Sequence, residues 1–399
     1  MMKRNTLIVS LLLLFVAMFA TDAFAQRAQI DARDGYRWRF DARVQFDGAY
    51  YFDDKNTLNP NMFQRRTTFR YTGDLGRQWR ARLDLDLAGI PEMEMRDVWI
   101  RYRVPESNLF FKVGYFKPLL HTQNTVGHAR PRYDFMERSV ANVFTRSRTL
   151  GMSVQYYQDQ YSLNLGFFTQ DLDDGRVMGA NTVGRQVTFR GSVAPILQDD
   201  RWVHLAIGAD YRDPGTTNDA PSRIRLRERA ETRAGADRFY HTGWINGVDN
   251  HIILNFDVQA VFNTIWLGGE FTTMSLNRID GFEDASFSAG HAFISWAVTG
   301  ESRGYESDDG EPARLASPIR NWGAISLGLR YSFIDLNDAD IFGGSGSHIT
   351  VGATYYPHRN IWLQLNVGLA DLDEHADGAG SYIGDDSFQF VQMRVGAWF

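Results

Sequence analysis

The sequence predicts an all-β protein, a closed transmembrane antiparallel β-barrel of about sixteen strands. Three observations predict this fold. Apolar and polar residues alternate with a period of two in many successive runs, the connectors between runs are short and long in turn, and the last run ends in an aromatic residue, Phe399, at the C-terminus. A soluble β-sandwich would not need this rhythm of connectors, whereas a barrel that crosses a bilayer does.

The first 25 residues have the three parts of a cleavable signal peptide. Lys3 and Arg4 precede an apolar run over residues 7–20, and the small-x-small sequence Ala23-Phe24-Ala25 follows it. The apolar run is shorter than the ~20 residues that a spanning helix needs, which disfavours a retained anchor. We expect cleavage before Gln26. Since no Pro- or Ser-rich linker divides the rest, residues 26–399 form one barrel domain.

The composition agrees with a membrane barrel although the mean hydropathy is slightly negative. A spanning strand needs only ~9–11 residues with alternate ones apolar, so the average hydropathy stays low. Aromatic residues make up 14% of the chain, as interfacial girdles of Trp and Tyr require. The chain has no cysteine, which excludes disulfide scaffolds and thiolate metal sites, and its net charge of -6 argues against a nucleic-acid partner.

Two early runs show the alternation most clearly. Residues 37–47 place Trp38, Phe40 and Val44 on one face and arginines and aspartates on the other, and residues 79–87 repeat the pattern. A charged face on a central strand needs water, so each strand has lipid on one side and solvent on the other. The other fourteen runs cover residues 62–72, 95–104, 109–117, 148–157, 161–169, 185–192, 203–211, 251–262, 265–274, 286–299, 322–332, 348–356, 361–370 and 387–399.

The connectors fit the two ends of an outer-membrane barrel. Short connectors at residues 73–76, 158–160 and 357–359 are typical of periplasmic turns, and long polar connectors at residues 117–147, 212–250 and 300–321 are typical of external loops. The last run places Met393, Val395, Ala397 and Phe399 on one face. This ending looks like the signal that barrel-assembly machinery recognises. We therefore expect a bacterial outer-membrane location, in contact with membrane lipid and lipopolysaccharide.

Fragments along nearly the whole mature chain resemble the phosphate-selective porins O and P. Phe135-Met136-Glu137-Arg138-Ser139 matches the "F-m-E-r-s" segment of that family, and Gln64-Arg65-Arg66-Thr67 looks like its early paired-arginine strand. Each fragment alone is a weak signal, but their order and spacing are specific. The other similar segments are residues 95–102, 113–118, 148–151, 298–305, 322–336 and 350–357.

The resemblance implies a sixteen-stranded barrel, usually a homotrimer, whose third external loop folds inward as a constriction. It also implies a pore for small anions, with phosphate or polyphosphate as candidate solutes. In the family, phosphate selectivity depends on a ladder of arginines along the wall and a lysine cluster in the constriction. This chain departs from that pattern, because its loop at residues 119–146 has arginines and histidines but no lysine.

Arginines on the polar faces of the first strands are the candidate pore-lining and anion-binding residues. A guanidinium fork suits the oxygens of phosphate or carboxylate, and charge of one sign in narrow water gives selectivity. The alternative is that these arginines solvate the wall and pair with aspartates on neighbouring strands. The candidates are Arg37, Arg39, Arg43, Arg66, Arg70, Arg80, Arg82, Arg101 and Arg103 on the wall, and Arg130 and Arg132 in the loop.

Glu137 and Arg138 are interpreted as an anchor that holds the constriction loop to the wall by hydrogen bonds. The mixed charges of residues 223–238 either attract anions to the mouth or form a solvated loop. Acidic clusters at residues 171–174, 335–340 and 371–374 suggest calcium ligands, but turn-forming carboxylates explain them better. No metal site and no cofactor is therefore assigned.

Other functions remain as alternatives to an anion channel. A general, non-selective porin would have the same fold and signals. A binding or adhesion barrel would use the long external loops, although these carry no distinctive apolar patch. The sequence contains no H-E-x-x-H, and its nine dispersed histidines do not make a catalytic triad, so an enzyme is not expected.

Overall fold

The computed structural model describes residues 28–31, 35–52, 55–88, 93–125, 131, 133–145, 147–169, 184–215, 222–234 and 238–399. The predicted signal peptide, residues 1–25, lies outside the described residues, as do the candidate residues Arg130 and Arg132.

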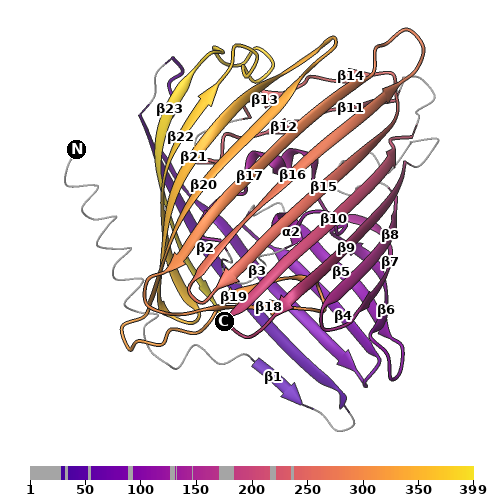
Figure 1. Ribbon diagram of the computed structural model, residues 1–399, viewed down its shortest axis with the longest axis vertical. Helices are drawn as coiled ribbons and strands as arrows, with labels where there is room; N and C mark the ends of the chain where they lie inside the picture. Colours follow the sequence, from indigo (N-terminus) through magenta and orange to yellow (C-terminus); the bar gives the residue numbers. More distant parts are fainter. Residues whose placement is uncertain are drawn as a thin grey trace.

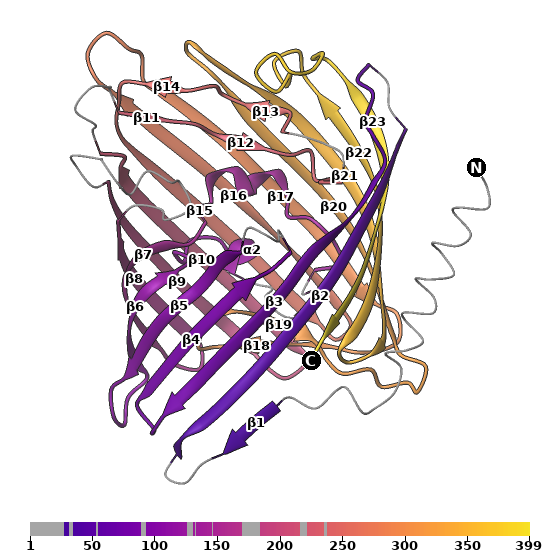
Figure 2. The same ribbon diagram turned by 180° about the vertical axis from the view of Figure 1, so that it is seen from behind.

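Sixteen antiparallel strands close into a tilted barrel (Figures 1 and 2). Each of the sixteen runs predicted from the sequence overlaps one of them, with ends that differ by a few residues. The barrel closes where the first strand pairs with the last, from Arg43 opposite Trp398 to Phe52 opposite Gln389. The strands are β2 (Arg37–Phe52), β3 (Asn61–Leu75), β4 (Trp79–Asp86), β5 (Glu94–Arg103), β6 (Leu109–Phe116), β7 (Thr149–Tyr157), β8 (Tyr161–Phe168), β9 (Arg185–Leu197), β10 (Arg201–Asp213), β15 (Val248–Phe262), β16 (Ile265–Arg278), β17 (Ala285–Ala297), β20 (Ala324–Asp338), β21 (Ile341–His358), β22 (Ile361–Leu372) and β23 (Ser387–Trp398).

Side chains alternate between the lumen and the outer surface, as the sequence predicts. Along β8, Leu163 and Leu165 are exposed on the outer surface, whereas Ser162 and Asn164 are buried in the lumen. The exposed apolar residues form the lipid-facing band that a transmembrane barrel requires. A short strand, β1 (Ala28–Asp31), extends the sheet by pairing with the start of β2. Among the described residues, no helix is long and apolar enough to cross a membrane.

One long connector lies at the opposite end of the barrel from the predicted one. The segment at residues 300–321 was expected to be an external loop, but it joins β17 to β20 at the end that holds the short turns and the C-terminus (Figure 1). The direction of the preceding strand determines the end of the barrel at which a connector lies. The length of a connector only correlates with that end. Within this segment β18 (Arg303–Glu306) and β19 (Glu311–Leu315) form a hairpin. We name residues 303–315 the inner hairpin.

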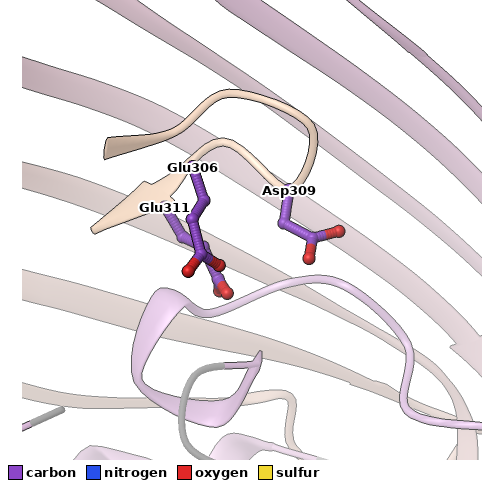
Figure 3. A group of neighbouring side chains, drawn as sticks. All are labelled: Glu306, Asp309 and Glu311. Atoms are coloured by element: carbon purple, nitrogen blue, oxygen red, sulfur yellow. The ribbon is translucent and has the colours of Figure 1, made fainter. Parts of the chain in front are cut away.

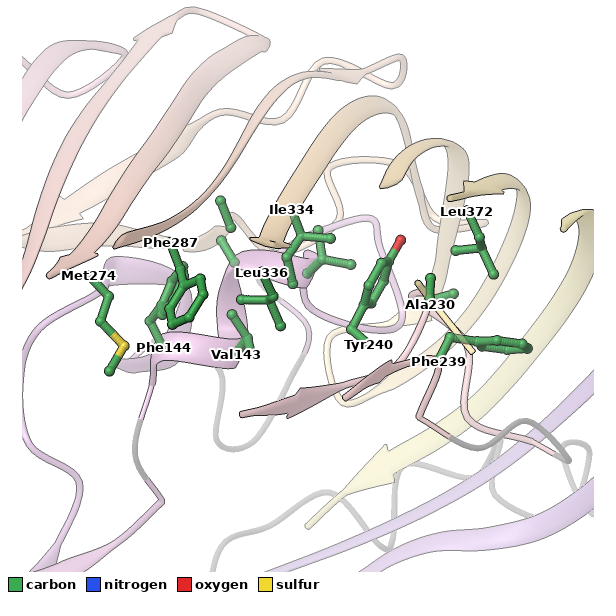
Figure 4. Packing of buried hydrophobic residues seen from close by; sticks show 14 of the residues in the cluster. Val143, Phe144, Ala230, Phe239, Tyr240, Met274, Phe287, Ile334, Leu336 and Leu372 are labelled. Atoms are coloured by element: carbon green, nitrogen blue, oxygen red, sulfur yellow. The ribbon is translucent and has the colours of Figure 1, made fainter. Parts of the chain in front are cut away.

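The constriction loop, residues 117–148 between β6 and β7, folds into the lumen as expected. It contains α2 (Thr122–Thr125) and the 3-10 helix η3 (Val140–Phe144). Val143 and Phe144 belong to an apolar cluster inside the barrel that also includes Met274 and Phe287 of the wall (Figure 4). Burial of these side chains stabilises the inward position of the loop, since removing apolar surface from water is favourable.

A second loop, residues 214–247 between β10 and β15, joins the same apolar cluster. Phe239 and Tyr240 are fully buried in it beside Ala230 (Figure 4). This segment was expected to be an external loop whose mixed charges attract anions or are solvated, so its inward packing was not predicted. We name residues 214–247 the long external loop. It contains β11 (Arg223–Ile224), β12 (Arg227–Glu228), β13 (Tyr240–His241) and β14 (Ile245–Asn246).

Candidate functional site

The described residues line three large cavities along the lumen, and arginine dominates the charged residues of each. The outer chamber, beside the long external loop, has a volume of about 550 Å³. The constriction chamber has a volume of about 210 Å³. The lower chamber, at the end with the short turns, has a volume of about 710 Å³. The first two chambers are adjacent, since they share Arg66, Arg96, Arg138, Arg229 and Arg233.

The constriction chamber has a large excess of positive charge. Its acidic residues are Glu137, Glu228 and Glu231, against nine arginines. Three of these arginines are candidates from the sequence: Arg43, Arg66 and Arg138. Two more, Arg229 and Arg233, belong to the mixed-charge segment 223–238, which was expected either to attract anions or to be solvated. The remaining four, Arg65, Arg96, Arg330 and Arg394, were not among the candidates from the sequence.

A β-bulge brings two consecutive arginines of β3 into the constriction chamber. Gln45 pairs with Arg66 and Phe46 pairs with Gln64, so Arg65 is the extra residue between them. In a regular strand consecutive side chains point to opposite faces, whereas a bulge re-aims one of them. The side chains of Arg65 and Arg66 are only 14% and 23% exposed. The bulge therefore turns a side chain that strict alternation assigns to lipid into a lumenal cation.

A second bulge, on β5, does the same for Arg96. Leu83 pairs with Val98 and Leu85 pairs with Met95, so both Arg96 and Asp97 lie opposite the single residue between the two leucines. Both of these side chains are buried. Arg96 Nη1 donates to Asp86 Oδ2 at 3.2 Å, and Arg66 Nη1 donates to the same oxygen at 2.6 Å. The two bulges thus bring three arginines to one region of the wall.

Glu137 of the constriction loop lies among three arginines from different parts of the chain. Its carboxylate is 3.0 Å from Arg394 of β23, 3.6 Å from Arg65 of β3 and 3.7 Å from Arg233 of the long external loop. Burial alone would raise the pKa of Glu137, but the three arginines outweigh that effect and hold the pKa well below its usual range. Glu137 is therefore ionised and links the loop to the wall.

Two wall arginines fix the constriction loop through its backbone. Arg394 Nη1 donates to the carbonyl oxygen of Met136 at 2.7 Å, and its other nitrogens bind both oxygens of Asp47. Arg330 Nη1 donates to the carbonyl oxygen of Glu137 at 3.0 Å, and Arg330 also binds the carboxylate of Glu231 in the long external loop. Arg330 therefore connects the two inward-folded loops.

Arg138, the second predicted anchor residue, bonds within the loop itself. Its Nη1 donates to Asn142 Oδ1 at 3.0 Å, and its side chain lines both the outer and the constriction chambers. Burial lowers the pKa of Arg138 to about 10, although Glu137 opposes that change. Arg138 still carries its charge at neutral pH, so it adds to the positive potential of the two chambers.

Several of the predicted wall arginines pair with aspartates of neighbouring strands. Arg70 Nη2 lies 2.6 Å from Asp84, and Arg82 Nη1 lies 3.9 Å from Asp97. Arg39 and Arg80 both pair with Asp74 near the short turns. These four arginines therefore fit the alternative in which wall arginines pair with aspartates of neighbouring strands. The arginines of the constriction chamber fit the anion-binding alternative, because they outnumber the acidic residues around them.

The remaining predicted arginines lie at the end with the short turns. Arg37, Arg80, Arg101 and Arg103 line the lower chamber together with Arg77. Arg101 and Arg103 lie over the ring of Phe110, at 4.6 Å and 5.7 Å from its centroid. Cation–π contact holds these guanidinium groups against the wall without cancelling their charge.

The inner hairpin and the constriction loop meet at Arg190 of β9. Arg190 Nη2 donates to Thr122 Oγ1 of the constriction loop at 2.7 Å and to the carbonyl oxygen of Gly310 at 3.1 Å. Asp257 lies beside this junction and accepts a hydrogen bond from Thr122. His204 contacts both Asp257 and Tyr305 of the inner hairpin, at 3.3 Å and 2.7 Å. These buried contacts fill the side of the lumen that lies away from β2–β6.

The acidic clusters that suggested calcium have local partners where the structure describes them. Asp373 Oδ1 accepts hydrogen bonds from the backbone N–H groups of His375 and Ala376, as a turn-forming carboxylate does. Asp340 pairs with Arg278. The cluster at residues 171–174 lies outside the described residues.

For some of the chamber arginines that were not predicted, the sequence did contain a signal. Arg330 and Arg394 lie on the polar faces of predicted strands, so the period of two could have identified them. Arg65 and Arg96 depend on bulges, which alternation cannot predict. Arg233 depends on the inward packing of the long external loop.

A closed sixteen-stranded barrel with charged cavities along its lumen defines a porin, a channel of the bacterial outer membrane. Residues 39–395 match the family model of phosphate-selective porin O and P. The chain therefore belongs to that family, whose members are channels rather than enzymes.

Two relatives extend the match. The chain is 27% identical over 321 residues to an uncharacterized protein of Caulobacter vibrioides, covering 77% of this chain but only 62% of that protein. It is 22% identical over 346 residues to Porin O of Pseudomonas aeruginosa, covering 82% of this chain and 77% of that protein.

Solved structures of porins share the fold. The trimer form of the outer membrane protein OmpT of Vibrio cholerae has a TM-score of 0.58 at 10% sequence identity, covering 92% of this chain and 100% of that chain. The anion-selective porin from Comamonas acidovorans has a TM-score of 0.54 at 13% sequence identity, covering 91% of this chain and 100% of that chain.

Proposed function

We propose that this protein is an anion-selective outer-membrane channel whose constriction binds phosphate or a similar oxyanion. The observation that carries the proposal is the set of arginines that the two bulges and the two inward loops bring to the constriction chamber. Nine arginines and three glutamates line this chamber, and even with Asp47 and Asp86, which pair with Arg394, Arg66 and Arg96, the balance of charge stays positive. A narrow, water-filled region of one charge sign attracts the opposite ion and excludes ions of the same sign.

Arg65 and Arg233 are the strongest candidates for direct anion contact. Both reach Glu137 only at ion-pair distances of 3.6–3.7 Å, which are longer than a normal hydrogen bond. The Nε groups of both arginines have no hydrogen-bond acceptor among the described residues. These Nε atoms are buried, but both side chains line the constriction chamber, where their guanidinium groups can reach a solute, and guanidinium groups bind phosphate oxygens in pairs. Arg394, by contrast, already binds Asp47, Met136 and Glu137.

The outer chamber supports attraction of anions toward this point. Its acidic residues are Glu94, Asp213 and Glu228, and twelve basic residues surround them. Solutes would pass from this chamber through the constriction and along the arginines of β2–β6, because the inward segments pack on the other side of the lumen. The basic residues are Arg66, Arg96, Lys117, Arg138, Arg148, Arg212, Arg223, Arg225, Arg227, Arg229, Arg233 and Arg238.

The test is a planar-bilayer measurement on the purified protein. The reversal potential under a potassium chloride gradient gives the anion preference, and added phosphate gives the half-blocking concentration. We expect anion selectivity and phosphate block in the native protein. Cation-selective or indifferent current would favour the general porin instead, and the absence of any channel would contradict both.

A single substitution tests the proposed binding residue. Arg65→Gln removes the guanidinium, so we expect the half-blocking phosphate concentration to rise roughly ten-fold or more, as loss of charged hydrogen bonds predicts. Arg201→Gln is the matched control, because Arg201 is exposed at the opposite end of the wall. An equal change in both variants, or no change in Arg65→Gln, would refute the role of Arg65.

The proposal includes the assembly of the channel. Residues 1–25 direct export and are removed, the barrel-assembly machinery recognises the strand that ends at Phe399, and lipopolysaccharide surrounds the external rim. Three barrels then associate as a homotrimer. Closure of the current in three equal steps would support the trimer.

A further inference from the structure

The inner hairpin brings acidic side chains into the periplasmic end of a lumen that is otherwise basic. Glu306, Asp309 and Glu311 lie close together, with a carboxylate oxygen of each within 4.8 Å of the others (Figure 3). Asp308, at the tip of the same hairpin, lines the lower chamber. The other charged residues of that chamber are five arginines and Asp74, and Asp74 is already paired with Arg39 and Arg80.

The backbone of the hairpin tip attaches it to the wall at β7–β9. Arg190 donates to the carbonyl oxygens of Gly310 and Asp309 at 3.1 Å and 3.4 Å. Gln155 donates to the carbonyl oxygen of Asp308, and Ser162 does so at 3.4 Å. The side chain of Asp308 is exposed to the lumen. The attachment therefore holds a carboxylate in the path of a solute.

We propose that Asp308 is a specificity-determining residue at the periplasmic mouth, where its carboxylate faces the arginine wall and promotes the release of anions. This inference rests on the anion-channel function proposed above. An exit lined only by arginines would retain an anion strongly. A fixed negative charge beside them reduces the local positive potential, which weakens that retention and lowers the preference for anions.

The charge of Asp308 depends on pH within the physiological range. Although water reaches its carboxylate, the surrounding hairpin and wall atoms raise the pKa of Asp308 to about 6, and Asp309 and Glu306 add to the increase. The group is ionised at about pH 7.5 and mostly neutral at about pH 5. The charged and titratable groups that face it or its hairpin are Tyr305, Glu306, Asp309 and Glu311 of the hairpin, Tyr36, Arg37 of β2, Asp74 of β3, Arg77, Arg80 of β4, Arg101 and Arg103 of β5, Lys112 of β6, Tyr157 of β7, Arg190 of β9 and His204 of β10.

The experiment compares Asp308→Asn and Asp308→Glu with the native channel in planar bilayers. Asp280→Asn is the matched control, because Asp280 is exposed in an external loop between β16 and β17. We expect Asp308→Asn to raise the anion-to-cation permeability ratio about two-fold and to lower the half-blocking concentration of phosphate added from the periplasmic side. Asp308→Glu and Asp280→Asn should match the native protein.

Acidification supplies a second readout. Lowering the periplasmic side from about pH 7.5 to about pH 5 should raise the anion preference of the native channel and leave that of Asp308→Asn nearly unchanged. If the native channel is anion-selective but Asp308→Asn matches it, or shifts no more than Asp280→Asn, the role of Asp308 is refuted. If the native channel shows no anion preference, the proposed function fails instead.

Discussion

Glu137 is the acidic residue on which the geometry of the constriction depends most directly. It neutralises part of the charge of Arg65, Arg233 and Arg394, which come from β3, from the long external loop and from β23. Without it, the three cations would lie close together with Asp47, which pairs with Arg394 and Arg65 but not with Arg233, as their compensating carboxylate. At the scale of the residue, the carboxylate of Glu137 therefore allows three arginines to lie close together in the constriction.

Glu137→Gln separates the electrostatic and the structural role of this residue. We expect the anion-to-cation permeability ratio to rise, because one negative charge leaves the constriction. We also expect the free energy of unfolding to fall by about 1–3 kcal/mol, because buried donors lose a charged acceptor. Bilayer reversal potentials and denaturant unfolding in detergent measure the two effects. The control is Glu283→Gln in an exposed loop, and a similar change in that variant would contradict the prediction.

At the scale of the element, β-bulges and inward segments build the site on a regular barrel. The bulges on β3 and β5 each add one residue, which brings Arg65 and Arg96 to the lumen. The inner hairpin reaches from its base between β17 and β20 to the wall at β7–β9. These departures from regular strands supply the residues that distinguish this lumen from a plain water-filled barrel.

A pair of cysteines tests the position of the inner hairpin. A Cβ atom at Gly310 would lie 3.3 Å from Cβ of Ser192, close to the separation in a disulfide. Since the native chain has no cysteine, Gly310→Cys with Ser192→Cys should form one specific cross-link on oxidation. Peptide mass spectrometry detects it. Gly310 has a φ of +60°, so the substitution costs about 1–2 kcal/mol.

The control for this cross-link pairs Ser192→Cys with Gly281→Cys, which lies in an external loop. That pair should not cross-link. Failure of the first pair in a folded barrel, or equal cross-linking of both pairs, would contradict the attachment of the hairpin to β9.

At the scale of the whole molecule, the inward segments determine how much of the barrel remains open. The constriction loop, the long external loop and the inner hairpin pack mainly against β7–β23, and the arginines of β2–β6 line the opposite side. We therefore expect a conductance well below that of an unobstructed barrel of sixteen strands.

Removing the inner hairpin tests this expectation. Arg303 and Leu315 are paired across the hairpin, so two glycines in place of residues 304–314 can close the chain as a tight turn. We expect the single-channel conductance to rise about two-fold, because the periplasmic mouth widens. Trimer stability in detergent is the folding control. An unchanged conductance in a folded trimer would show that the hairpin does not limit flow.

The sequence by itself determined the barrel, its sixteen strands and, for strands with one apolar and one charged face such as β2 and β4, the face turned to lipid. A period of two over short runs carries this information locally, because alternate side chains of a strand point to opposite sides. It also predicted the inward constriction loop and part of the arginine set, including Arg43, Arg66 and Arg138, through the resemblance and the alternation.

Only the tertiary structure decided the composition of the constriction and the end at which the long segment of residues 298–323 lies. Arg65 and Arg96 enter the lumen because bulges break the alternation, and a bulge depends on pairing with a neighbouring strand. Arg233 and Arg394 meet Glu137 although about 95 and 255 residues separate them from it along the chain. Such contacts depend on closure of the barrel, so no local pattern of residues encodes them.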